Sequence, residues 1–106
     1  MIITSTEQIP NKEIGEILGL VRGGTVRARH IGRDIFAGFK NIVGGEISEY
    51  TKLQAESREE AIFRMIEDAK KLGADAIIGT RLNTSMITQG ASEILAYGTA
   101  VKFKQK

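Results

Sequence analysis

The side chains best suited to chemistry gather around residue 30. Arg29, His30, Arg33 and Asp34 fall within one short stretch, and His30 is the only histidine in the chain. If a helix begins near residues 31–32, its first N–H groups and the positive end of its dipole face these basic side chains. Such a helix start suits a phosphate, a carboxylate or a nucleotide. The sequence therefore predicts a small-anion site formed by Arg29, His30, Arg33 and Asp34.

The same charges also have a purely structural interpretation. Arg29 and Arg33 could pair with Asp34, or with Glu46 and Glu49 further along the chain. These pairs could form within one subunit or across an interface between subunits. Salt bridges that support assembly are at least as common as ligand sites, so this alternative stays open beside the anion site.

A metal site is the next alternative. His30 and Asp34 are four positions apart and would share one face of a helix, which supplies two ligands. Glu46 and Glu49 could add oxygen ligands, but their spacing does not show that they converge. The chain has no cysteine, and a closed structural zinc site needs four ligands. The residues of one subunit are therefore not expected to form a metal site alone, although a ring could gather several copies of His30 around its axis.

An enzyme is the third alternative, because Asp34 could orient His30 as a general base. No Gly-x-Ser-x-Gly nucleophile motif is present. The pairs Gly23-Gly24 and Gly44-Gly45 do not fit the spacing of a dinucleotide-binding or P-loop motif. The sequence thus identifies no catalytic residue and no cofactor, and we expect a protein that binds rather than catalyses.

Composition limits the remaining classes of function. The 106 residues suffice for one domain, 1–106, with 42% hydrophobic and 26% charged residues. A net charge of +2 is too small to indicate nucleic-acid binding, and Phe36 and Phe39 fit a core better than a stacking surface. No signal peptide and no apolar run of about 20 residues is found. The sequence predicts a cytoplasmic protein without a membrane or nucleic-acid partner.

The periodicity of apolar residues predicts an α+β fold. Strands are expected over 14–29, 75–82 and 93–103, with a break at 22–25 and a long polar hairpin loop over 83–92. Helices are expected over 31–43 and 46–72. The order strand, helix, strand, strand predicts a parallel pair between the first two strands and an antiparallel pair between the last two.

The helix over 46–72 carries the clearest pattern. Its apolar stripe passes through Ser57 without losing phase and comprises Ile47, Tyr50, Leu53, Ala61, Met65, Ala69 and Leu72. The sequence Ser57-Arg58-Glu59-Glu60 is also a capping-box pattern, which could begin a new helix at Ser57. We predict one continuous helix.

Apolar residues on both faces of the strands predict an oligomer. Ile14, Leu18 and Leu20 are expected on one face of the first strand, with Ile17 and Val21 on the other. Strands that are apolar on both faces are normally buried on both faces. Because one short chain cannot supply a second layer, neighbouring copies are expected to cover it.

The chain resembles the YbjQ-like family, a group of uncharacterised prokaryotic proteins that sometimes carries a heavy-metal-binding label. The resemblance rests on RARHIGRDI at 27–35, NIVGGEI at 41–47, EYT at 49–51, LGADA at 72–76 and EILAYGTAV at 93–101. It implies a dodecin-like β-α-β-β subunit with a long helix on a small mixed sheet. It also implies assembly into a pentameric ring, with short extra strands joining the subunits, and it implies no reaction.

Overall fold

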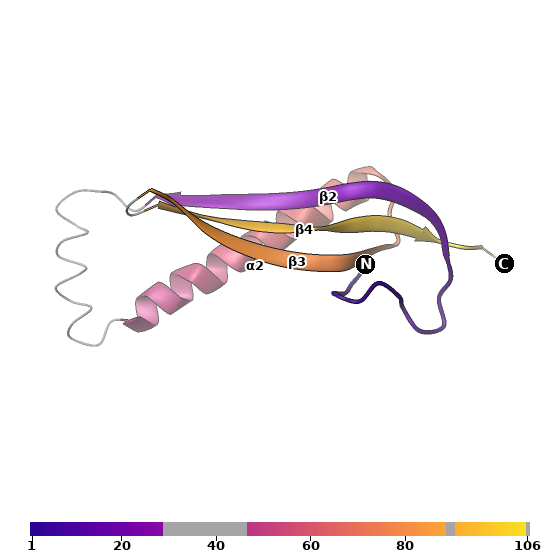
Figure 1. The fold of residues 1–106 in the computed structure, drawn as a ribbon, viewed down its shortest axis with the longest axis horizontal. Helices are drawn as coiled ribbons and strands as arrows, with labels where there is room; N and C mark the ends of the chain where they lie inside the picture. Colours follow the sequence, from indigo (N-terminus) through magenta and orange to yellow (C-terminus); the bar gives the residue numbers. More distant parts are fainter. Residues whose placement is uncertain (29–46, 89–90, 106) are drawn as a thin grey trace.

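The computed structural model describes residues 1–28, 47–88 and 91–105. In these ranges a four-stranded mixed sheet is packed on one face by a single helix (Figure 1). The elements are β1 (Ile2–Ile3), β2 (Ile14–Ala28), α2 (Ile47–Lys71), β3 (Ala76–Thr88) and β4 (Ala91–Phe103). The predicted α+β class is confirmed, and the helix predicted over 31–43 lies outside the described residues.

The order of strands in the sheet is β1-β3-β4-β2, which corrects the predicted pairing. β2 pairs with β4 in antiparallel register from Ile14↔Phe103 to Ala28↔Ala91. β2 and β3 do run in the same direction, but β4 lies between them, so they are not neighbours. β4 follows β3 after two residues and pairs with it in antiparallel register, and β1 pairs with the other side of β3 as a parallel strand.

The prediction of a long loop over 83–92 was wrong. β3 continues to Thr88 and β4 begins at Ala91, so most of this segment is strand. Residues 81–87 are all exposed. This segment, which mixes polar and apolar residues, is therefore a strand exposed on both faces rather than an irregular loop.

β2 is continuous through 22–25, where a break was predicted. Its irregularities lie earlier, between Ile14 and Glu16 and between Ile17 and Gly19. Gly19 has φ +129°, a conformation that side chains disfavour. The irregularity also changes which residues share a face, because Leu18 and Val21 both pack toward the core while Ile17 and Leu20 are exposed.

Gly23 marks the place where α2 crosses β2 most closely. A Cβ added there would overlap the backbone of Ala61 and Met65 in the helix. The absence of a side chain thus lets the helix backbone lie directly on the strand. Close approach of another backbone is one of the functions of glycine in a strand.

Gly23→Ala is expected to lower the free energy of unfolding by about 1–3 kcal/mol, because the helix must move away from the strand. Gly24→Ala is the matched control, since the nearest atoms to its added Cβ lie at 3.7 Å. Urea unfolding at one fixed subunit concentration measures both variants. Equal midpoints for the two would contradict the close approach.

The core lies between α2 and the β2–β4 half of the sheet. Ala61, Met65 and Ala69 of the predicted stripe are completely buried, against β2 and β4 residues that include Val21 and Ile94. The prediction of one continuous helix is confirmed. Ser57 is buried within it, and its carbonyl oxygen accepts a hydrogen bond from the hydroxyl of Thr25 at 3.2 Å.

The chain is elongated, with principal extents of 60 × 21 × 16 Å. Its radius of gyration is 17.7 Å, whereas a compact domain of about 100 residues has about 13 Å. Figure 1 shows why: the first part of α2 diverges from the far ends of the strands instead of lying along them. A single layer of this shape leaves much of its own surface without a covering element.

Candidate functional site

The four residues predicted to bind an anion, Arg29, His30, Arg33 and Asp34, lie outside the described residues. They follow directly on Ala28, where β2 ends opposite the first residue of β4. Glu46, one of their alternative partners, also lies outside, and Glu49 belongs to α2. Both the anion site and the salt-bridge alternative therefore stay predictions.

Within the described ranges, no three or more His, Cys, Asp or Glu side chains come close enough together to hold a metal ion. The same ranges contain no helix long and apolar enough to cross a membrane.

The sheet face opposite α2 carries exposed apolar side chains, and the residues on this face were predicted incorrectly from the sequence. We call it the open face and define it by the β2 residues Ile17, Leu20 and Val26, whose exposed fractions are 68%, 66% and 59%. On β4 their direct neighbours are Val101, which is completely buried, and Thr99 and Glu93, which are half-buried. An apolar surface of this kind is typical of an interface.

A second exposed apolar group lies on the far part of β3. Leu82, Met86 and Ile87 have exposed fractions between 47% and 79%. Here β3 has β4 on one side, and β1 pairs with β3 only at Ala76 and Ile77. The sequence analysis missed this feature because it treated the segment as a loop.

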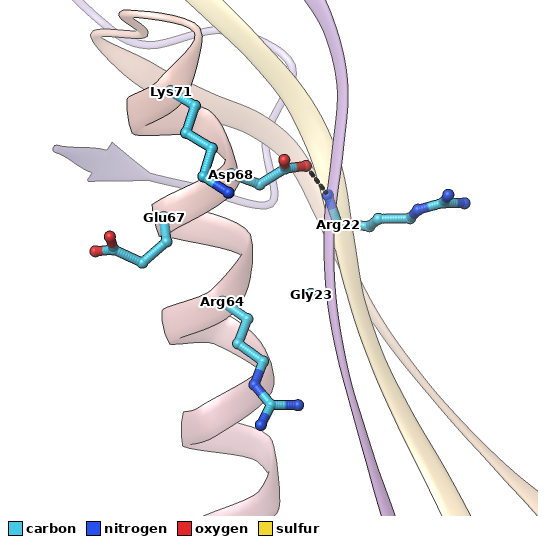
Figure 2. Close-up of a pocket in the computed structure, with 6 residues that line it drawn as sticks. All are labelled: Arg22, Gly23, Arg64, Glu67, Asp68 and Lys71. Atoms are coloured by element: carbon cyan, nitrogen blue, oxygen red, sulfur yellow. Dashed lines mark hydrogen bonds between the residues drawn. The ribbon is translucent and has the colours of Figure 1, made fainter.

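A shallow groove of about 410 Å³ runs between β2 and α2. It is lined by Arg22, Gly23, Arg64, Glu67, Asp68 and Lys71 (Figure 2). Cations and carboxylates alternate along it, so it has no single sign of charge. Figure 2 shows the guanidinium of Arg22 extending away from the helix side chains.

The hydrogen bonds across the groove join side chains of α2 to the backbone of β2. The backbone N–H of Arg22 donates to the carboxylate of Asp68 at 3.2 Å, and the guanidinium of Arg64 donates to the carbonyl oxygen of Gly24 at 2.6 Å. Arg64 also pairs with Glu60 at 2.6 Å. The helix side chains thus bind backbone groups of the outermost strand, which identifies a structural contact rather than a ligand site.

The fold also occurs in a solved protein of unknown function from Pediococcus pentosaceus. The two structures superpose with a TM-score of 0.69 over 98% of each chain, at 19% sequence identity. The class defined by the fold is therefore that of small α+β domains with one long helix on a mixed sheet, known from at least one other solved protein without an assigned function.

Sequence comparison gives the family. Residues 1–104 match the YbjQ family, which is described as "Putative heavy-metal-binding". UPF0145 proteins are 59% identical in Archaeoglobus fulgidus, over 98% of this chain and 96% of the relative, and 54% identical in Methanosarcina acetivorans over the whole of both chains. The relative from Thermotoga maritima is 55% identical over 99% of each chain. The chain belongs to the YbjQ family, which confirms the resemblance seen in the sequence.

Proposed function

We propose that this protein acts as a homo-oligomeric scaffold, a closed ring in which sister copies cover the open face, and that the ring binds a small anion. The observation that carries the oligomer is the exposure of Ile17, Leu20 and Val26 on one side of a single-layer sheet. An elongated subunit supports the same conclusion, since it cannot fold back over its own apolar face. The family resemblance suggests five copies.

Native mass spectrometry and sedimentation velocity test this proposal directly. We expect a single species at a multiple of the 11.6 kDa subunit mass, stable at micromolar concentration. The native spectrum reports the number of subunits and any ligand mass that the assembly retains. A stable 11.6 kDa species under these conditions would exclude the oligomer.

The anion is proposed to bind where β2 ends, at Arg29, His30, Arg33 and Asp34. Two arginines and a histidine at the helix start predicted from the sequence would favour a phosphate or carboxylate over a neutral ligand. Because the segment adjoins the end of a strand in every copy, a ring would present one such group per subunit.

Arg33→Glu is expected to remove ligand stabilisation or weaken assembly while leaving the subunit folded. A thermal-shift series with inorganic phosphate, nucleotides and dicarboxylates measures the first effect, and a ligand at a hundred times its Kd stabilises by about 2.7 kcal/mol. Arg33→Lys is the control, since it keeps the charge. An identical ligand profile and an unchanged oligomer for Arg33→Glu would reject the site.

The description of the family favours a metal site as a second candidate. One histidine and no cysteine per chain make it necessary to share such a site between copies. A site on the ring axis, where several copies of His30 meet, predicts fewer than one tightly bound ion per subunit after incubation with Zn²⁺, Cu²⁺ or Ni²⁺, whereas a site between neighbours predicts one; in both cases His30→Ala should abolish binding. Native mass spectrometry counts the ions per assembly, and retention by His30→Ala would rule the shared site out.

A further inference from the structure

The outer edge of β3 is covered by other strands for only part of its length. β1 pairs with Ala76 and Ile77, and the following residues extend this contact through the hydrogen bonds Gly79 N–H to Thr6 and Thr80 N–H to Thr4. The guanidinium of Arg81 donates to the carbonyl oxygen of Ser5. After this residue β3 continues to Thr88 with β4 as its strand partner.

Among the described residues, no strand beyond β4 and no helix covers residues 82–87, the free edge of β3, whose one irregularity lies at its end, between Met86 and Thr88. No charged residue and no proline occurs in the sequence between Arg81 and Glu93. Natural proteins block such edges with lysine, proline, bulges or a covering element, because unpaired backbone groups act as a template for another strand. The free edge is therefore suited to pairing.

The opposite edge of the sheet, β2, is protected in its middle and open at its end. Asp68 and Arg64 of α2 bind the outward backbone groups of Arg22 and Gly24. Alternate residues of an antiparallel strand direct their backbone groups to the same side, so those of Val26 also point outward. Among the α2 side chains that the structure describes, none bonds to Val26, and the side chain of Val26 is 59% exposed.

The same alternation fixes the direction of the groups on β3. The backbone N–H and C=O groups of Arg22 and Gly24 point away from β4, so the backbone groups of the odd-numbered β2 residues around them bond to β4. The partners of these residues on β4 are even-numbered. The odd-numbered β4 residues therefore direct their backbone groups toward β3. Ser85 pairs with one of these, Glu93, and so bonds to β4. The N–H and C=O of Thr84, the next residue, point outward from the sheet.

The two open segments lie at the same level of the sheet. Val26 and Ser85 are both register partners of Glu93, and Ala28 and Thr88 are both partners of Ala91. A closed ring relates its subunits by rotation without translation along its axis. Two edge segments can meet around such a ring only if they lie at one height, and these two do for an axis along the strands.

We infer that the free edge of β3 in one copy pairs with the end of β2, around Val26, in the next copy. β2 and β3 run in the same direction, so the pairing is parallel for an axis along the strands. Each copy then pairs its β3 edge with one neighbour and the end of its β2 with the other neighbour. The contact repeats from subunit to subunit until the ring closes. This inference rests on the proposed homo-oligomer and specifies how its copies join.

Thr84→Pro is the first test, with Thr84→Ala as its control. Proline removes an N–H that makes no bond within the subunit, and it is tolerated on an outer strand edge. We expect the concentration for half-dissociation to rise at least tenfold for Thr84→Pro and to stay unchanged for Thr84→Ala. Far-ultraviolet circular dichroism of both variants checks that the subunit stays folded.

Val26→Cys combined with Ser85→Cys is the second test and involves no proline. The chain has no cysteine, and within one subunit these positions are two strands apart, about 10 Å, which is too far for a disulfide. Mild oxidation should produce a covalent ladder ending at the ring size, and either single variant should give at most a dimer.

The outcomes separate this inference from the proposed function. An intact oligomer for Thr84→Pro, together with no ladder for the double cysteine variant, overturns the edge pairing and leaves the homo-oligomer standing. A wild-type protein that is a single subunit overturns both.

Discussion

If sister copies cover the open face as proposed, Leu20→Glu is expected to convert the oligomer into single folded subunits. Leu20 is 66% exposed on the open face, so a glutamate there costs the isolated subunit almost nothing. In the assembly the same carboxylate would be buried against a sister copy without a partner. An uncompensated buried charge costs about 3–5 kcal/mol, which raises the Kd of assembly by roughly a hundredfold or more.

Sedimentation velocity across a dilution series measures this change. Glu59→Lys is the control, because Glu59 is exposed on α2, away from the open face, and its replacement tests whether any new surface charge disrupts assembly. The oligomer should persist in Glu59→Lys. If Leu20→Glu sediments like the wild type at all concentrations, the open face is not the covered surface.

Met65→Ala is the substitution expected to reduce subunit stability most. Met65 is completely buried between α2 and the sheet, beside Val21 and Ile94. Its truncation removes packed atoms and leaves a cavity, which costs about 2–5 kcal/mol. Because a domain of this size has only about 5–15 kcal/mol of stability, the variant should unfold at a much lower urea concentration.

Phe63→Ala is the matched comparison for Met65→Ala. It lies on the same helix and removes a larger side chain, but that side chain is 59% exposed. We expect a much smaller loss of unfolding free energy, measured at the same subunit concentration so that assembly contributes equally. A loss as large as that of Met65→Ala would contradict the described position of the core.

Local patterns in the sequence were sufficient for the main elements. The stripe through Ala61, Met65 and Ala69 predicted a continuous helix because helical periodicity depends only on neighbours in the chain. The strands were located for the same reason. Their pairing depends on contacts between distant residues, so the position of β4 between β3 and β2 did not follow from the pattern.

The faces of β2 could not be assigned from alternation alone. The irregularity near Gly19 shifts the alternation by one position, which brings Leu18 and Val21 to the same side and exposes Ile17 with Leu20. Glycine indicates that such an irregularity is possible but does not give its position. The predicted site at Arg29, His30, Arg33 and Asp34 lies outside the described residues, so its geometry stays a prediction.

The place of β4 in the sheet has a consequence for how the protein is made. β4 is the last strand to be synthesised, yet it lies between β3 and β2 and supplies all of the pairing of β2 within the described residues. Until residue 103 has left the ribosome, β2 has no strand to join, and α2 has no finished surface to pack on. The sheet can therefore be completed only after β4 has been synthesised.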